Sequence, residues 1–369
     1  MKIMISTSDG NSLINFQGDL IKDMTRRGHE VVCTSVEPEA QMKDRISSLG
    51  ANYYCIPYKK KGINLISSIK IMLNYITVYR LLKPDLCFLF MSKQVVLGGL
   101  ASIYCHIKHI VVFVTSLDDM FYSAGIMQAL IRFILKIPYK IAYKKSETVF
   151  FMNHDDYRKM MIWKLVNKKQ SVVMNGSGVN MDFFEKKPMP KSDVVCMTAR
   201  HLWSRGVREY RKAAEIVRNK YPEVRFLLVG GIDEKSGEIS EKELDEAVEK
   251  GIIYYCGYSK DIRHYLEVCS IYVLPSYQEG NGRSIMEAEA IGRPIITTKA
   301  PGSQNTVIDG YNGFLIPPRD EAALADKIIM LLENQELKRN MAQNSYQLCC
   351  KKFDVKKINE ILLKRMHLL

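Results

Sequence analysis

Apolar and polar residues alternate along the chain in a way that predicts short buried strands separated by amphipathic helices. Near the N-terminus, residues 2–6 form an apolar run, residues 13–27 carry apolar positions at helical spacing, and Gly28 follows as a helix C-cap. The same order recurs through the first half of the chain. We predict strands at 2–6, 30–35, 52–56, 85–90, 110–114, 148–152 and 171–174, with helices at 65–82 and 126–143 among them.

A polar segment with two prolines, residues 185–193, interrupts this alternation, and a second series of strands and helices follows it. Strands separated by helices indicate parallel sheets covered on both faces. The predicted fold is therefore α/β, with two Rossmann-like domains facing an interdomain cleft. The second series has strands at 194–199, 224–229, 252–256, 271–275 and 294–298, and helices at 207–220, 241–250, 261–269 and 284–291, before two final helices.

The predicted domains are residues 1–188 and 189–350, and residues 351–369 form a C-terminal helix that we expect to pack back on the first domain. In parallel sheets of this kind, ligands bind beyond the carboxyl ends of the strands. The functional residues are therefore expected in the loops that leave the strands.

Composition excludes several classes of protein. The chain has 369 residues, 47% hydrophobic and 25% charged, as in folded globular proteins and unlike disordered chains. No stretch reaches the roughly 18 uncharged apolar residues of a transmembrane helix, and the start MKIMIST does not resemble a secretory signal. The nine cysteines form no CxxC pair, so we predict reduced cysteines and no zinc site.

Positive charge is concentrated in the first half. Residues 1–190 hold 26 Lys and Arg against 15 Asp and Glu, a net charge of +11, whereas the remaining residues carry only +2. Such an excess indicates an anionic partner, which can be nucleic acid, an anionic membrane surface or a phosphorylated substrate.

The most informative segment is residues 274–294, LPSYQEGNGRSIMEAEAIGRP, which leaves a predicted strand and enters a helix. The N-terminus of that helix offers unpaired N–H groups to a phosphate. Glu279 lies in the loop and Glu287 lies eight residues later in the helix. Carboxylates accept paired hydrogen bonds from vicinal hydroxyls, so the two acids fit the ribose and the hexose of a nucleotide sugar.

This segment resembles the donor-binding signature of the family 4 retaining glycosyltransferases, which have the GT-B fold. The overall resemblance is greatest to bacterial N-acetylgalactosaminyltransferases that act on undecaprenyl-diphosphate-linked acceptors. Further matching motifs in the second half are ARHLWSRGV (199–207), RFLLVGG (225–231), CGYSKDI (256–262) and DGYNGFLIPP (309–318). The first half contributes RRGHEV (26–31), NHDDY (153–157) and GSGVNMDFF (176–184).

The resemblance implies roles for individual residues. Glu279 would contact the donor sugar, Glu287 would bind the ribose hydroxyls, and Arg200 and Arg205 would bind the diphosphate. Arg205 replaces the lysine usual in the family, and Glu289 is expected to be an ordinary surface acid. The remaining predicted substrate-binding residues lie in neighbouring loops: Gly10, Gly231, Tyr258, Gly280, Asn281, Gly282, Arg283 and Ser284. The family pattern requires neither a metal nor another cofactor.

The acceptor side departs from the family pattern. Family members commonly have Thr-Gly-Leu-Gly where this chain has Thr-Ser-Leu-Asp, residues 115–118. Asp118 therefore stands where the backbone freedom of glycine is usual. Two readings remain: Asp118 faces the acceptor hydroxyl, or it caps the helix that follows.

The function that these residues imply is that of a retaining, metal-independent hexosyltransferase. It would transfer a hexose or N-acetylhexosamine from a UDP-sugar to a polyprenyl-diphosphate-linked glycan during assembly of bacterial surface polysaccharide. Two alternatives are a UDP-sugar epimerase of GT-B architecture, which lacks the paired glutamates, and a basic nucleic-acid-binding protein. The chain has no zinc module, RNP motif or recognition-helix pattern to favour the latter.

Residues 126–145 alternate apolar residues with Arg and Lys. Such a helix can lie on an anionic membrane surface, or it can be a core helix with a solvated basic face. Both readings remain open. We expect a cytoplasmic protein, peripheral on the inner face of the cell membrane, that does not bind nucleic acid.

Overall fold

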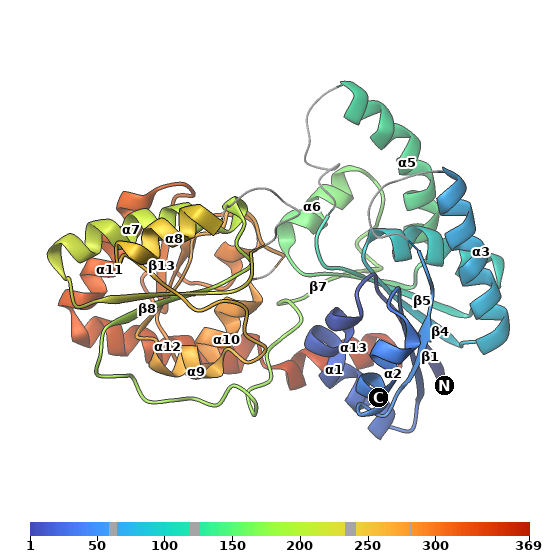
Figure 1. Cartoon of the computed structure of the whole chain (residues 1–369). Helices are drawn as coiled ribbons and strands as arrows, with labels where there is room; N and C mark the ends of the chain where they lie inside the picture. Colours follow the sequence, from blue (N-terminus) through green and yellow to red (C-terminus); the bar gives the residue numbers. More distant parts are fainter. Residues whose placement is uncertain (59–64, 118–125, 233–240, 281) are drawn as a thin grey trace. The chain divides into compact units, whose positions relative to one another are not determined.

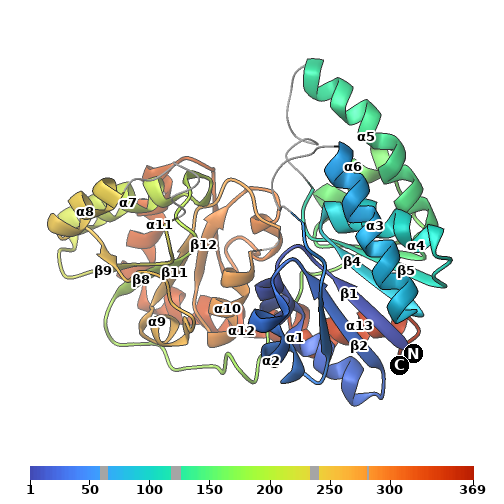
Figure 2. The same cartoon turned by 45° about the vertical axis from the view of Figure 1, so that its right-hand side comes forward.

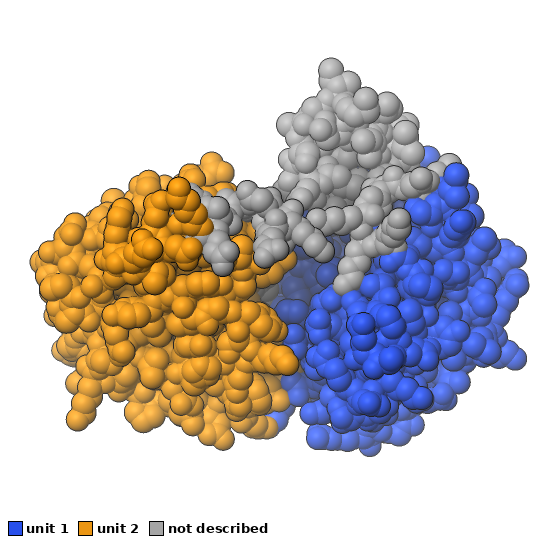
Figure 3. All heavy atoms as spheres, viewed as in Figure 1, with its two compact units in different colours: residues 1–177, 356–369 blue, residues 178–355 orange. Residues whose placement is uncertain are grey.

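A computed structural model describes residues 1–58, 65–117, 126–232, 241–280 and 282–369. It divides into two compact units, coloured separately in Figure 3. Unit 1 comprises Met1–Ser177 with Lys356–Leu369, and unit 2 comprises Gly178–Val355. Each unit is a parallel α/β domain, so the predicted pair of Rossmann-like domains is confirmed (Figure 1). Every helix within the described residues is too short or too polar to cross a bilayer.

Unit 1 contains a seven-stranded sheet of order β3-β2-β1-β4-β5-β6-β7, with all neighbours parallel. Its strands are β1 (Lys2–Ser6), β2 (Glu30–Ser35), β3 (Asn52–Cys55), β4 (Leu86–Phe90), β5 (His109–Val114), β6 (Thr148–Phe151) and β7 (Ser171–Val173). Its helices are α1 (Gly10–Arg26), α2 (Glu39–Ser47), α3 (Leu65–Leu82), α4 (Gly99–Tyr104), α5 (Ile126–Lys145), α6 (His154–Ile162) and α13 (Val355–Arg365), with a π-helical turn η1 (Gln94–Gly98) before α4.

Two separate cores cover the faces of this sheet. Strand β4, LCFLF, is wholly buried because Leu86, Phe88 and Phe90 enter one core while Cys87 and Leu89 enter the other. Helices α1, α2 and α13 form the first core, and α3, α4, α5 and α6 form the second. The views in Figures 1 and 2 show these two helical layers. The C-terminal helix thus packs on the first sheet, as the fold prediction required.

Unit 2 contains a six-stranded parallel sheet of order β10-β9-β8-β11-β12-β13. Its strands are β8 (Val194–Thr198), β9 (Arg225–Val229), β10 (Tyr254–Tyr255), β11 (Ile271–Leu274), β12 (Ile295–Thr298) and β13 (Gly313–Ile316). Its helices are α7 (Val207–Lys220), α8 (Glu241–Glu249), α9 (Arg263–Val268), α10 (Arg283–Ile291), α11 (Glu321–Glu333) and α12 (Gln335–Lys352), with 3-10 turns η3 (Trp203–Arg205) and η4 (Ser303–Asn305).

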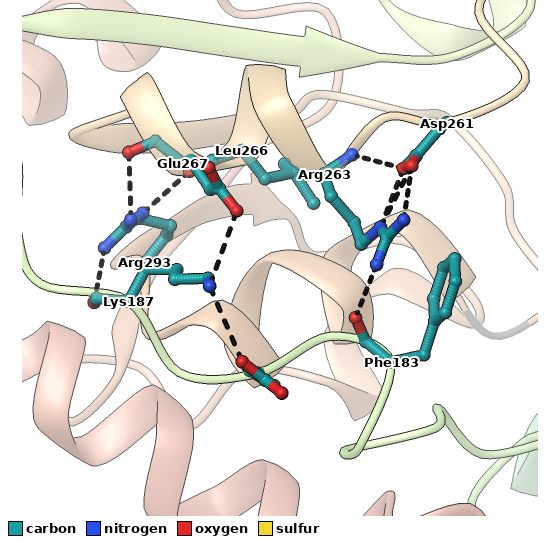
Figure 4. Close-up of polar contacts among 8 residues, drawn as sticks. Phe183, Lys187, Asp261, Arg263, Leu266, Glu267 and Arg293 are labelled. Atoms are coloured by element: carbon teal, nitrogen blue, oxygen red, sulfur yellow. Dashed lines mark hydrogen bonds and ion pairs between the residues drawn. The ribbon is translucent and has the colours of Figure 1, made fainter.

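Within unit 2, a fully buried arginine holds the Pro-containing segment 185–193 against helix α9 (Figure 4). Arg293 follows α10 and donates from Nε to the Leu266 carbonyl at 2.9 Å, from Nη2 to Glu267 at 3.1 Å and from Nη1 to Lys187 at 3.2 Å. The first two carbonyls belong to the last turn of α9, where helical partners are missing. One side chain therefore caps α9 and holds the polar segment against it.

Replacing Arg293 by Met is expected to lower the free energy of unfolding by about 3 kcal/mol or more, because one buried and two partly buried carbonyls lose their donor. Urea denaturation measures the change. The matched control is Arg263→Met in the same network, since Arg263 is only partly buried and pairs with the neighbouring Asp261 (Figure 4). An Arg293 variant no less stable than the Arg263 variant would contradict the capping role.

Candidate functional site

The order of strands in unit 2 defines where a ligand can bind. From the central strand β8, the chain proceeds outward through β9 and β10 on one side and through β11, β12 and β13 on the other. The carboxyl ends of β8 and β11 therefore form a topological switch point, the usual ligand position in open α/β sheets. Arg200 follows β8 by two residues, and Glu279 follows β11 by five.

The loop after β8 contacts the segment after β11. The Tyr277 N–H donates to the Ser204 carbonyl at 2.8 Å. Gly206 has a φ of +77°, and a Cβ there would lie 2.2 Å from the carbonyl oxygen of Pro275. Only glycine permits both this backbone conformation and this approach. The contact fixes Arg205, which precedes the glycine, beside the loop that carries Glu279.

Glu279 is held by contacts from three loops. Its carboxylate forms an ion pair with Arg205 and accepts a hydrogen bond from the hydroxyl of the buried Ser276 at 2.8 Å. Its backbone N–H donates to the Pro301 carbonyl at 2.9 Å. Gly302, at φ +82°, lies so close that a Cβ there would be 2.0 Å from the Glu279 carbonyl oxygen. The carboxylate is thus positioned without any ligand.

The second predicted carboxylate lies on α10. The Glu287 side chain is only 14% exposed, and the Nε of Arg283 donates to its Oε1 at 3.0 Å. Burial raises the pKa of Glu287, and the Arg283 charge opposes that rise. Gly282 precedes α10 with a φ of +51° and provides no side-chain cap to the N–H groups of the first turn. These groups and the Arg283 guanidinium give this end of α10 a positive character.

The other predicted residues have varied positions. The guanidinium of Arg200 is exposed and, within the described part of the chain, makes no hydrogen bond or ion pair. Gly231 packs beside Tyr258, whose side chain is 75% exposed. Gly280 lies in the loop between β11 and α10, and Ser284 is the second residue of α10. Asn281 lies outside the described residues, as does Asp118.

Gly10 is in unit 1, where it is the first residue of α1. Its N–H donates to the carboxylate of Glu37 at 2.9 Å, and the same carboxylate accepts a hydrogen bond from Ser35 at 2.6 Å. In this structure, an acid of the chain itself therefore accepts the hydrogen bond of the Gly10 N–H, and Gly10 as a substrate-binding residue stays a prediction.

One prediction for this region is wrong. Glu289 was expected on the surface, but it is fully buried and accepts a hydrogen bond from the amide of Asn312 at 2.8 Å. It lies two residues after Glu287, on the opposite face of α10 and against the core. Burial raises its pKa well above the usual range, which favours the neutral acid.

Sequence reasoning gave no functional role to His201, which follows Arg200 and is fully buried. Its ring lies 5.1 Å from that of Tyr255, and neither ring nitrogen has a hydrogen-bond partner among the described residues. Burial lowers the pKa of His201 to about 4. The folded chain thus holds a neutral imidazole over a range of pH in which an unfolded chain binds a proton.

Acidification is therefore expected to destabilise the fold. Between pH 6.5 and 4 the unfolded state binds the extra proton, so stability falls as pH falls, by up to about 3 kcal/mol from this one group. Denaturation at several pH values in this range should show that the free energy of unfolding falls less steeply in His201→Phe than in the wild type. His264→Phe, which replaces an exposed histidine of the same unit, should keep the wild-type slope. Identical slopes for all three proteins would contradict the assignment.

No residues in the described ranges gather as a group of three or more His, Cys, Asp and Glu that could hold a metal ion. The groups near the switch point are instead the guanidinium groups of Arg200 and Arg205, the carboxylates of Glu279 and Glu287, and the N-terminus of α10. Such a set can bind an anion next to a group rich in hydroxyls.

Residues 180–348, almost all of unit 2, match the family model "Glycosyl transferases group 1". The chain is 28% identical, over 94% of its length and 93% of the relative's, to the N,N'-diacetylbacillosaminyl-diphospho-undecaprenol alpha-1,3-N-acetylgalactosaminyltransferase of Campylobacter jejuni. It is 24% identical to an Escherichia coli UDP-Gal:alpha-D-GlcNAc-diphosphoundecaprenol alpha-1,3-galactosyltransferase, covering 74% of this chain and 73% of that protein.

Solved structures show the same fold. Anabaena HepE, crystallised with UDP and glucose, has a TM-score of 0.81 at 19% identity, with both chains fully covered. The sucrose-phosphate synthase of Thermosynechococcus elongatus has a TM-score of 0.77 at 18% identity, covering 100% of this chain and 98% of that one. The chain therefore has the GT-B fold and is a glycosyltransferase, and its second unit matches the group 1 family model.

Proposed function

We propose that this glycosyltransferase transfers a hexose or N-acetylhexosamine from a UDP-sugar, with retention of configuration, to a polyprenyl-diphosphate-linked glycan. The observation that carries the proposal is the preformed pair of Arg205 and Glu279 at the switch point of unit 2. The Arg205 cation can bind a diphosphate, and the adjacent Glu279 carboxylate can accept hydrogen bonds from the sugar attached to it. The names of the Campylobacter and Escherichia coli relatives support the choice of acceptor.

Each side chain has a role in this proposal. Arg200 is exposed and forms no ion pair with any residue that the structure describes. Arg200 and Arg205 bind the diphosphate together with the N–H groups of the first turn of α10. Glu287 accepts hydrogen bonds from the ribose, and Glu279 accepts them from the sugar. Tyr258 and Gly231 border the base. Gly280 and Gly282, in the loop before α10, and Ser284, in its first turn, contact the phosphates.

The proposed reaction needs no separate base. The acceptor hydroxyl attacks the anomeric carbon while the bond from that carbon to the diphosphate oxygen breaks. The diphosphate leaves with the electron pair, and its oxygen takes the acceptor proton, so the attack occurs from the face of departure and configuration is retained. Arg200 and Arg205 stabilise the charge that develops on the leaving group. Because they supply that charge, we propose a metal-independent reaction.

The acceptor also sets the proposed location. A polyprenyl chain is held in a membrane, and most of unit 1 lies within residues 1–190, which carry the net charge of +11. A basic surface is attracted to anionic lipid. We therefore propose a cytoplasmic protein, peripheral on the inner face of the cell membrane, that serves in assembly of bacterial surface polysaccharide.

The test is a screen of UDP-hexoses and UDP-N-acetylhexosamines with a polyprenyl-diphosphate-linked sugar as acceptor. UDP release and the anomeric configuration of the product are measured with and without EDTA. We expect acceptor-dependent release, a product with the donor's configuration and no loss in EDTA. An inverted product would contradict the mechanism. Conversion of UDP-N-acetylglucosamine without acceptor would indicate an epimerase instead.

A further inference from the structure

The outer surface of helix α3 has an unusual composition. At 100° per residue, seven of its exposed residues fall within an arc of about 120°. They are Ile66, Ile69, Lys70, Leu73, Thr77, Arg80 and Leu81. Four are aliphatic and two are basic, and Ile69 and Leu73 are 48% and 52% exposed. A helix that packs only on a sheet usually presents polar residues to water.

This composition continues over the neighbouring helices. Helix α4 packs against both α3 and α5 on the same face of the sheet, and Figure 2 shows the three together. In α5, Ile137 is 62% exposed and Ile141 is 44% exposed, beside the exposed Lys140 and Lys144. Tyr104 of α4 is 60% exposed, and the Arg80 guanidinium lies 5.7 Å from the centre of its ring.

The charge of this layer has a single sign. Helices α3, α4 and α5 contain no Asp or Glu, and residues 45–117 include one acid, Asp85, against nine Lys and Arg. On the opposite face of the sheet, α1, α2 and α13 carry acids and bases together. The helical layer that contains no acids therefore coincides with the exposed aliphatic side chains.

We propose that the outer face of the α3–α4–α5 layer docks on an anionic lipid bilayer. Ile66, Ile69 and Leu73 would enter the boundary between headgroups and acyl chains, and Lys70, Arg80 and the α5 lysines would contact lipid phosphates. Exposed branched aliphatics favour lipid over nucleic acid, for which stacking aromatic residues are the usual apolar contacts. The inference rests on the proposed function, whose acceptor is held in a membrane, and it names the surface that meets that membrane.

The experiment measures binding to vesicles that contain no glycan acceptor, so it does not depend on turnover. Cosedimentation with phosphatidylcholine vesicles is compared with and without phosphatidylglycerol. Wild-type protein should bind the anionic vesicles at least about tenfold more tightly, and added salt should weaken binding. The variant Ile69→Glu with Leu73→Glu should bind them at least about tenfold less tightly.

A matched control lies on the opposite face of the same sheet. Ile361 of α13 is 44% exposed, and Ile361→Glu should bind vesicles like the wild type. Should the double variant fail to fold by circular dichroism, Lys70→Glu with Lys140→Glu replaces it and should also lose binding. Transfer to a water-soluble acceptor should be unchanged in the variants, which separates lost docking from lost catalysis.

Three results would overturn the inference. The first is undiminished vesicle binding by the substituted proteins, and the second is an equal loss in Ile361→Glu. The third is that the protein binds single-stranded RNA and not vesicles, and that Ile69→Glu with Leu73→Glu abolishes the RNA binding. If vesicles bind as expected but no UDP-sugar is turned over, the docking surface stands and the proposed function fails.

Discussion

Replacing Arg205 by Ala is expected to lower kcat by about 10³-fold, the largest effect of any single substitution considered. The guanidinium is partly buried beside Glu279, where it cannot be replaced by solvent cations at the same position. In the proposed reaction it stabilises charge that grows as the diphosphate departs, so its loss raises the barrier more than it weakens donor binding. Steady-state kinetics of UDP release measures the change.

Two further variants make this result specific. Arg205→Lys restores the residue usual in the family and should recover a large part of the activity, although an ammonium cannot form the paired contacts of a guanidinium. Arg208→Ala removes a nearby arginine that stacks on Trp203 at 4.1 Å and should leave kcat unchanged. Equal losses at positions 205 and 208 would indicate a structural effect and contradict the assigned role.

Replacing Glu279 by Ala is expected to lower kcat by about 10²–10³-fold with little loss of stability. The carboxylate is preoriented by Ser276 and Arg205, so its interactions with the sugar cost no reorganisation during the reaction. Because the sugar, not the nucleotide, would lose its partner, the affinity for UDP should stay close to that of the wild type. Calorimetric titration with UDP and kinetics of transfer together test this separation.

The control for Glu279 is another glutamate that is ion-paired in unit 2. Glu321 lies 2.7 Å from Lys212 in its ion pair, and Glu321→Ala should not affect turnover. Glu279→Gln keeps an acceptor oxygen and should fall between Ala and the wild type. A Glu279→Ala enzyme within a few-fold of wild-type kcat would exclude a direct role in transfer.

Much of the fold was predictable from local pattern. Helix α10, predicted at 284–291, begins one residue earlier at Arg283. The central strand β8, predicted at 194–199, ends one residue earlier at Thr198. Buried strands in parallel sheets are short continuous apolar runs. In the helices that cover such sheets, apolar residues recur with a clear helical period. Strand β13, the four residues Gly313–Ile316, was missed; it begins with glycine, a residue depleted in strands.

The site was less predictable than the fold. Spacing assigns Glu287 and Glu289 to opposite faces of a helix, but only packing reveals that the second face is the core. The contacts that hold Glu279 come from Ser276, Pro301 and Gly302, which lie in different loops. The bond between Gly10 and Glu37 likewise joins residues 27 positions apart. Such contacts depend on tertiary structure, which single-sequence patterns do not contain.

A crystal structure of the chain with bound UDP tests the central claim most directly. The account predicts that the diphosphate lies at the carboxyl ends of β8 and β11, within hydrogen-bond distance of Arg200 or Arg205, with the ribose hydroxyls on Glu287. UDP bound at any other edge, or carboxylates at 279 and 287 directed away from the nucleotide, would contradict it.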